Sequence, residues 1–370
     1  MKQGILFGVA LLVAACGNQH ASGSVVATSS PSGIASPATT PTVWPSQPIT
    51  SPNVPAYFAC ANAGACPPAA GIAAAFDPAR EDIVTFGGVD YPNNHIQVRD
   101  STWTFKGGAW LQLHPAHVPP PRDAAVLVFD AARKVVLMYG GRDVPAAATA
   151  GKGGEVGNIT FAADTWTWDG SDWTQQHPAH HPVLFVPNAT YDHARNEVVL
   201  FGFGPTGMET WTYDGADWIQ HPAVHGKPDP PRIQGWLAFD PASKTVVTFG
   251  GFNSGGADLT AVWEWNGQTW TRTAAAAPAV NRLGSIVAPD LDRPSMLLYD
   301  SDGTGAGAST WRWDGFTFQR LQPSHQPQVP ALALTADPPR HRLLLFGWTW
   351  PDRQFQVWSW SGGDWSLVAV

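Results

Sequence analysis

The chain has 370 residues, of which only 14% are charged, and it contains 37 Gly, 34 Pro and 19 Trp. Many glycines and prolines with few charged residues favour short strands and turns over long surface helices, so we expect an all-β protein. The net charge of −8, without a basic run, argues against nucleic acid as a partner.

The N-terminus has the pattern of an export signal. Lys2 precedes an apolar run from Ile5 to Val13, a stretch too short to span a membrane as a helix, and small residues lead to Cys16. The ending Val-Ala-Ala-Cys resembles the lipobox of bacterial lipoproteins, in which cleavage leaves the cysteine as the lipidated first residue. An ordinary signal peptide and the start of a buried helix are the alternatives. We interpret residues 1–16 as a lipoprotein signal with Cys16 as the lipidation site, which predicts an extracytoplasmic protein anchored to a bacterial membrane.

Residues 17–53 are rich in Ser, Thr, Pro and Ala and carry almost no charge. Such a segment cannot bury enough surface to offset its ordering entropy, so we expect a disordered tether. Cys60 and Cys66 follow the tether close together. In an exported chain this spacing favours a disulfide over a metal site, which two thiols do not complete.

The remaining chain, residues 54–370, repeats one unit six times. Each unit has an aspartate that is followed ten residues later by glycine, or once by Asp300; the six aspartates are Asp77, Asp130, Asp192, Asp240, Asp290 and Asp337. Further on, two aromatic residues stand seven positions apart; the six pairs are Trp103 and Trp110, Trp166 and Trp173, Trp211 and Trp218, Trp263 and Trp270, Trp311 and Phe318, and Trp358 and Trp365. This regularity indicates a repeat protein.

Each unit of about 50 residues divides into four strands, which in the second unit are DAAVLVFD, KVVLMYGG, DTWTWD and DWTQQH. A unit this small cannot bury both faces of its sheet, so the units stack, and closing the stack gives a six-bladed β-propeller with four antiparallel strands per blade. The expected blades are about 67–118, 119–181, 182–229, 230–279, 280–328 and 329–370. We expect blade 6 to meet blade 1 without shared strands; the alternative is an added outer strand from VPAYFA around Tyr57.

A glycine doublet at the end of the second strand, with an aromatic residue and then a Trp further on, resembles the kelch repeat. The version DTWTWDGSDW is similar to the kelch propellers of bacterial secreted proteins, which are related to the central domain of galactose oxidase. The resemblance covers about residues 67–370. It implies a propeller, but kelch propellers serve as binding platforms, sugar epimerases and oxidase scaffolds alike, so it selects no function.

The hairpin in DTWTWDGSDW has two possible registers. A two-residue turn sets Trp166 opposite Trp173, whereas a four-residue loop sets Trp168 opposite Trp173. Either register leaves the three indoles on one face, because strand side chains alternate. We expect this face to pack against the next blade as core, since the placement recurs in every blade; the alternative is a platform of exposed indoles that stacks on carbohydrate.

The connection between the second and third strands varies most between units, and the interval that contains it ranges from nine to twenty-six residues. We expect the ligand on the face that carries these loops. The longest loop runs from Arg142 to Ala163, and the other candidate ligand-binding residues on this face are Tyr91, His95, Phe252, Trp348 and Trp350.

Three arginines, Arg122, Arg232 and Arg282, lie eight residues before the aspartates of blades 2, 4 and 5. At the axial opening three guanidiniums would suit a carboxylate or another planar anion, with Asp123 as a nearby acid. The alternative, which we prefer, is that this arginine belongs to the repeat and braces the adjacent loop.

Eight histidines fall in the blade-to-blade connections: His114, His117, His177, His180, His181, His221, His225 and His325. Because they are expected near the rim, one group per blade, we interpret them as part of the repeat and predict no metal site. A copper-radical site like that of galactose oxidase needs a cysteine beside a tyrosine in the propeller, and both non-lipid cysteines precede the first repeat, so we expect no cofactor.

These patterns predict a monomeric, non-catalytic propeller that binds a protein or a glycan through its variable-loop face. The alternative is a sugar-acid isomerase or glycoside hydrolase that uses the arginine cluster at the axis.

Overall fold

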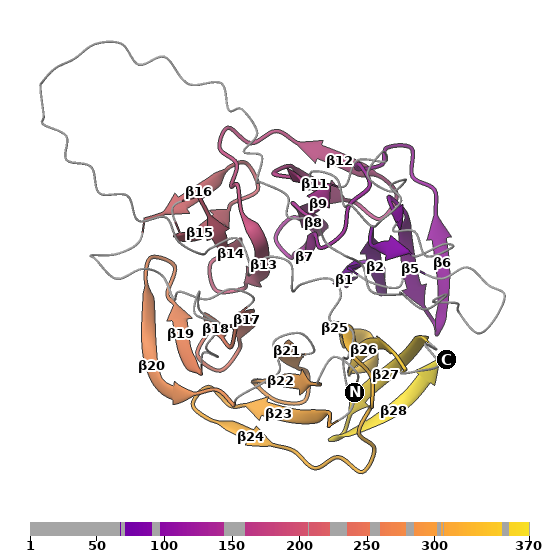
Figure 1. The fold of residues 1–370 in the computed structure, drawn as a ribbon, viewed down its shortest axis with the longest axis vertical. Coiled ribbons are helices and arrows are strands. Elements are labelled where there is room, and N and C mark those ends of the chain that lie inside the picture. Colours follow the sequence, from indigo (N-terminus) through magenta and orange to yellow (C-terminus); the bar gives the residue numbers. More distant parts are fainter. Residues whose placement is uncertain are drawn as a thin grey trace, which may run out of the picture.

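The computed structural model describes residues 67, 71–90, 97–143, 160–205, 207–222, 235–251, 260–278, 285–301, 305, 307–349 and 355–369. They form six four-stranded antiparallel sheets arranged in a ring, a six-bladed β-propeller, as predicted (Figure 1). Within the described residues, no helix is long and apolar enough to cross a membrane.

Within each blade four strands lie side by side in chain order, with the first strand nearest the axis and the last at the rim (Figure 1). Blade 1 contains β1 (Ala73–Asp77), β2 (Asp82–Phe86), β5 (Thr102–Lys106) and β6 (Ala109–Leu113). Blade 2 contains β7 (Val126–Asp130), β8 (Val135–Tyr139), β11 (Thr165–Trp168) and β12 (Trp173–Gln176). Blade 3 contains β13 (Phe185–Asp192), β14 (Glu197–Gly204), β15 (Gly207–Tyr213) and β16 (Trp218–His221).

The second half of the ring repeats this order. Blade 4 contains β17 (Trp236–Asp240), β18 (Thr245–Phe249), β19 (Ala261–Trp265) and β20 (Trp270–Ala276). Blade 5 contains β21 (Ile286–Asp290), β22 (Ser295–Asp300), β23 (Ser309–Trp313) and β24 (Phe318–Arg320). Blade 6 contains β25 (Ala331–Asp337), β26 (Arg342–Trp348), β27 (Phe355–Ser361) and β28 (Asp364–Ala369), with a 3-10 helix, η4 (Pro338–Arg340), between its first two strands.

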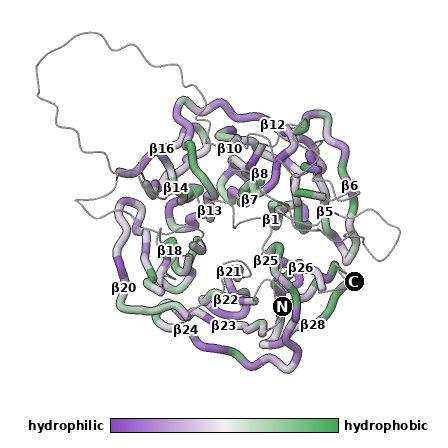
Figure 2. Tube along the Cα trace, viewed as in Figure 1, coloured by the Kyte–Doolittle hydropathy of each residue, from purple (hydrophilic) through white to green (hydrophobic). Residues whose placement is uncertain are grey.

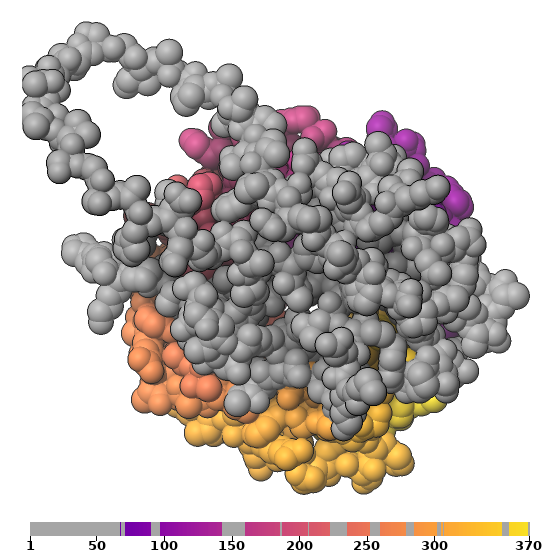
Figure 3. Space-filling view, viewed as in Figure 1, coloured from indigo at the N-terminus to yellow at the C-terminus, as the bar shows by residue number. Residues whose placement is uncertain are grey.

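Blade 6 forms its sheet from its own four strands, as expected, and the alternative segment around Tyr57 lies outside the described residues. Two short ribbons lie in the connections between the second and third strands of blades 1 and 2: β3 (Val89–Asp90) pairs with β4 (Gln97–Val98), and β9 (Arg142–Asp143) with β10 (Thr160–Phe161). The outer strands of blades 4 to 6 are visible in orange and yellow at the rim (Figure 3).

The repeated aspartate shapes the turn between the first and second strands of each blade. In five blades its Oδ1 accepts the backbone N–H of the residue two positions later, at 2.9 to 3.1 Å. All six aspartates are buried, and in four blades an arginine three positions later forms an ion pair with the carboxylate. This use of the side chain explains why the aspartate recurs at one spacing.

The register of the outer hairpin is the one given by a four-residue loop, because Trp168 lies opposite Trp173. The same pairing holds in every blade, for example between Phe105 and Trp110 and between Trp360 and Trp365. Trp168 and Trp173 are 2% and 1% exposed, so these indoles are core and not a carbohydrate platform. Apolar stretches accordingly coincide with strands around the ring, among them β13, β25 and β28 (Figure 2).

The expected direction of this packing was wrong, since the indoles face the preceding blade and not the next one. The ring centroids of Trp173 and of Phe86 in blade 1 are 5.2 Å apart. The Nε1–H of Trp173 also donates to Oγ1 of Thr102, again in blade 1, at 2.9 Å. At all six boundaries the last aromatic residue of one blade packs against an aromatic residue of the blade before it, with ring centroids 5.0 to 5.8 Å apart. Each buried aromatic removes about 150 to 250 Å² from water, so these contacts contribute strongly to the stability of the ring.

Candidate functional site

On the variable-loop face, the described candidate residues Arg122 and Asp123 lie in the segment that enters blade 2. Its backbone joins two blades, because Arg122 donates its N–H to the Arg99 carbonyl of blade 1, at 3.1 Å, and Asp123 and Arg142 exchange two hydrogen bonds. Gly87 and Gly141 stand against this segment, where a β-carbon would crowd the backbone of Arg122 and Asp123. The segment is therefore tightly held on both sides.

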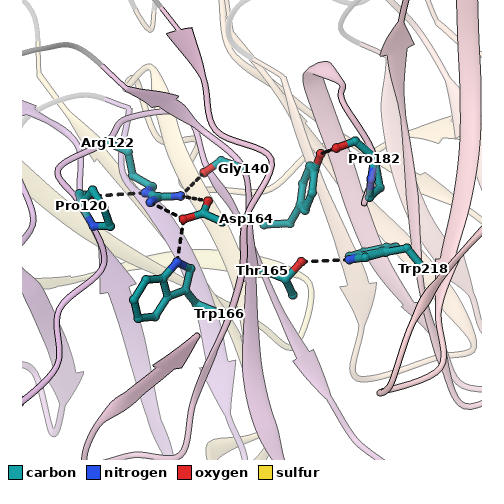
Figure 4. A network of polar contacts seen from close by, with 9 residues as sticks. Pro120, Arg122, Gly140, Asp164, Thr165, Trp166, Pro182 and Trp218 are labelled. Carbon is teal, nitrogen blue, oxygen red and sulfur yellow. Dashed lines mark hydrogen bonds and ion pairs between the residues drawn. The ribbon is translucent and has the colours of Figure 1, made fainter. Parts of the chain in front are cut away.

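Arg122 is 2% exposed, and its guanidinium is held by acceptors of the protein itself (Figure 4). Nε donates to the Pro120 carbonyl at 3.0 Å, and Nη1 donates to the Gly140 carbonyl at 2.9 Å. Both Nη atoms also form a two-pronged ion pair with Asp164, at 2.5 and 2.9 Å. Such a guanidinium has no open side for a ligand, so Arg122 braces the loop, which was the alternative we preferred.

Asp164 occupies a position that recurs two residues before the first Trp of the outer hairpin. The position accepts the indole N–H of that Trp in four blades: from Trp166 to Asp164, Trp211 to Glu209, Trp311 to Ser309 and Trp358 to Gln356, at 2.7 to 2.9 Å. Burial favours the neutral acid at Asp164, but the hydrogen bonds and charge of Arg122 outweigh it and lower the pKa of this carboxyl. Sequence reasoning missed this position, although its fixed offset from the Trp was the available signal.

The neighbouring residues Asp123 and Arg142 form a second ion pair. Arg142 Nε donates to Asp123 Oδ1 at 2.8 Å, and its Nη2 contacts the other carboxylate oxygen. Asp123 is 3% exposed and faces its own arginine. Among the described residues, the two arginines and two carboxylates of this cluster neutralise each other, which gives it a bracing role and leaves Asp123 poorly placed as a general acid.

The other candidates on this face divide into two groups. Trp348 is half-buried at the end of β26, opposite Phe355 in register. Tyr91, His95, Phe252, Trp350, Arg232 and Arg282 lie outside the described residues, as do the cysteines Cys16, Cys60 and Cys66. The expected positions of Arg232 and Arg282 at the axis therefore stay predictions.

Three of the repeated histidines, His117, His180 and His325, form clips between blades at the rim. The backbone N–H of His117 donates to Asp172 Oδ1 at 2.8 Å, and its Nδ1 lies 2.6 Å from Oδ2 of the same aspartate. His180 and Asp217 repeat this pair in the next blade, and His325 and Asp364 repeat it at blade 6. These bonds lower the pKa of each aspartate. In the part of the chain that the structure describes, no three metal-binding side chains converge.

Comparison with known proteins adds a likeness of fold alone. No protein-family model matches the sequence, and no curated protein matches it. A solved structure described as "Structure of YjhT" is similar at 13% identity, with 68% of this chain and 84% of that chain covered and a TM-score of 0.49. This likeness is too low to carry an argument about the site or its chemistry.

Proposed function

We propose that this chain is a non-catalytic binding platform outside the cytoplasm, held to a membrane by a lipid on Cys16, which binds a protein or a glycan through its variable-loop face. The observation that carries the proposal is that the repeated side chains have structural roles. The aspartates hold turns, the indoles pack between blades, and three of the histidines join neighbouring blades at the rim. What differs between blades is the length of the connections on one face.

The cluster of Arg122, Asp164, Asp123 and Arg142 supports binding over catalysis, because its acids and bases are paired with each other. Within that cluster, Arg122 is tied to Asp164, and Arg142 to Asp123. A rigid scaffold that presents loops of unequal length is the usual arrangement for recognition, because the loops vary without disturbing the core. The Ser, Thr, Pro and Ala tether of residues 17–53 would supply the distance from the membrane that such a platform needs.

The binding face is tested with a purified chain that begins at Gly17 and therefore carries neither the signal segment nor the lipid. Replacing residues 144–159 by a short Gly-Ser turn removes the longest connection and leaves the β9–β10 pairing at its base. The matched control changes the opposite face, with Gly107→Asn in the exposed turn of blade 1, where an added β-carbon has no other atom within 4 Å. On a glycan array and in pull-downs with cell-surface extracts, we expect the loop variant to lose its ligand and the control to keep it.

Equal binding by both variants would contradict the use of this face, and no binding to any glycan or protein would contradict a binding platform. The lipid is tested separately by metabolic labelling with a fatty acid. We expect the wild-type chain to take up the label and the Cys16→Ser chain to lack it; equal labelling of the two chains, or no labelling of either, would contradict lipidation at Cys16.

A further inference from the structure

The turn between β19 and β20 contains the only Asn-Gly dipeptide of the sequence, Asn266 and Gly267. Asn266 is exposed, at the first position of the outer-hairpin loop of blade 4. In blades 2, 3 and 5 the same position is an aspartate: Asp169, Asp214 and Asp314. In blade 4, therefore, an asparagine precedes the turn glycine where these three blades have an aspartate.

The turn does not distinguish between the amide and the acid. Asn266 Oδ1 accepts the backbone N–H groups of Gln268 and Thr269, both at 2.9 Å. The three aspartates accept the equivalent pair of N–H groups through Oδ1, at 2.7 to 2.9 Å. Because only the oxygen is used, an aspartate at position 266 would keep both bonds.

Gly267 cannot be exchanged for a bulkier residue. Its φ of +96° is a conformation that L side chains rarely adopt, and a β-carbon there would overlap the guanidinium of Arg195 from blade 3. Gly170 and Gly215 are held in the same way by Arg80 and Arg133. The fold thus requires the glycine, and glycine is the residue that least hinders attack by its own backbone nitrogen on a preceding asparagine.

We infer that Asn266 is a site of spontaneous deamidation in the folded protein. The backbone nitrogen of Gly267 attacks Cγ of Asn266, a new N–Cγ bond forms, and the Cγ–Nδ2 bond breaks with release of ammonia, which carries away the amide proton of Gly267. Water then opens the resulting succinimide at one of its two carbonyls, which gives aspartate or isoaspartate. No oxidant, metal or second protein is required.

The aspartate product acquires an interaction that blades 2 and 3 already have. At Asp169 the hydrogen bond from Ser171 is the largest influence that lowers the pKa, and the nearby charge of Arg80 acts in the same direction. At Asp214 backbone hydrogen bonds act first, and Arg133 adds to them. Arg195 stands over Gly267 as these arginines stand over their own glycines, so it would attract a carboxylate at position 266.

The test follows the intact purified chain over time at mildly alkaline pH by peptide mass spectrometry. We expect the peptide with Asn266 to convert to its aspartate and isoaspartate forms and the protein to gain one negative charge. Asn196 is the internal control, because it also lies in an exposed turn but precedes Glu197, whose side chain hinders the attack. It should convert later than Asn266.

Two variants sharpen the result. Asn266→Gln keeps an amide but requires a larger ring for the same attack, so no conversion should be seen. Asn266→Asp reproduces the main-chain product and should unfold at a urea concentration equal to or above that of the unconverted wild type. A urea-denatured sample shows that the dipeptide itself reacts. If the denatured chain converts while the folded chain does not, or if Asn196 converts first, the inference is overturned.

Discussion

Replacement of Val357 by threonine should strengthen the boundary where the ring closes. In blades 2, 3, 4 and 6 the last Trp donates its Nε1–H to a buried threonine of the preceding blade: Trp173 to Thr102, Trp218 to Thr165, Trp270 to Thr210 and Trp365 to Thr310, at 2.8 to 2.9 Å. In blade 1 the donor is Trp110, and the threonine position of blade 6 holds Val357. The buried Nε1 of Trp110 has no hydrogen-bond partner among the described residues.

At the boundary between blades 4 and 5, apolar residues occupy both positions of this contact, so no indole N–H is left without an acceptor. There the threonine position holds Val262, and the last aromatic residue is Phe318, which has no N–H to satisfy. Val262→Thr is therefore the matched control, because it makes the same substitution at the same place in the repeat without a donor opposite. Both valines are buried, at 1% exposure or less.

The two variants should move stability in opposite directions. An unsatisfied buried N–H costs about 1 to 3 kcal/mol, and a new neutral hydrogen bond contributes about 1 kcal/mol, so Val357→Thr should raise the free energy of unfolding by about 1 kcal/mol. A hydroxyl buried without a partner at position 262 should lower it by about 1 to 3 kcal/mol.

Urea unfolding followed by tryptophan fluorescence measures both free energies, and the indole N–H resonance of Trp110 reports the new bond directly. We expect this resonance to shift in Val357→Thr and to stay unchanged in Val262→Thr. Equal destabilisation by the two substitutions, with no shift at Trp110, would refute the role given to the threonine.

Three further measurements test the bracing contacts. Arg122→Ala should lower the free energy of unfolding by about 3 kcal/mol, because it leaves a largely buried carboxylate without its partner; a loss no greater than that of a surface substitution would contradict the brace. The clip to His117 lowers the pKa of Asp172 below its ordinary value of 3.8, so its stabilising effect is present above that value and is lost as the pH falls through the lowered pKa. Asp172→Asn should therefore flatten the acid limb of a stability profile, and an unchanged limb would argue against the clip. Burial lowers the pKa of His221, whose Nε2 lies 2.9 Å from Thr212 Oγ1, below 6.5. The unfolded chain then takes up the proton first, so stability should fall as the pH drops below 6.5. Burial lowers the pKa of His193 in the same way, so His221→Gln should remove part of that fall, and an undiminished fall would contradict the contribution of His221.

The sequence predicted the ring because its spacing rules are local. The distance from Asp130 to Gly140 spans one hairpin, and the interval from Trp166 to Trp173 spans another, so the strands and their order follow from counting. The sequence left the register of the outer hairpin open, because a two-residue and a four-residue loop place the same side chains on the same face of the sheet.

Relations between distant residues were beyond the reach of the pattern. Asp164, the partner of Arg122, is 42 positions away in the sequence, and its pairing depends on how the two strand ends meet. Alternation along a strand tells which side chains share a face, but not whether that face meets the blade before or the blade after. For the same reason the pairing of His117 with Asp172, 55 positions apart, was not visible as a motif.

The indole–threonine and glycine–arginine links between blades have a direction, and this has a consequence for how such a ring can grow. The later blade supplies the indole and the glycine, and the earlier blade supplies the threonine and the arginine, as at Trp218 and Thr165 or at Gly215 and Arg133. A tandem duplication of one unit therefore creates a matched boundary at once, since the new copy brings a donor for its predecessor and an acceptor for its successor. Closure joins the last unit to the first, and at that boundary Trp110 has a valine, Val357, at the threonine position.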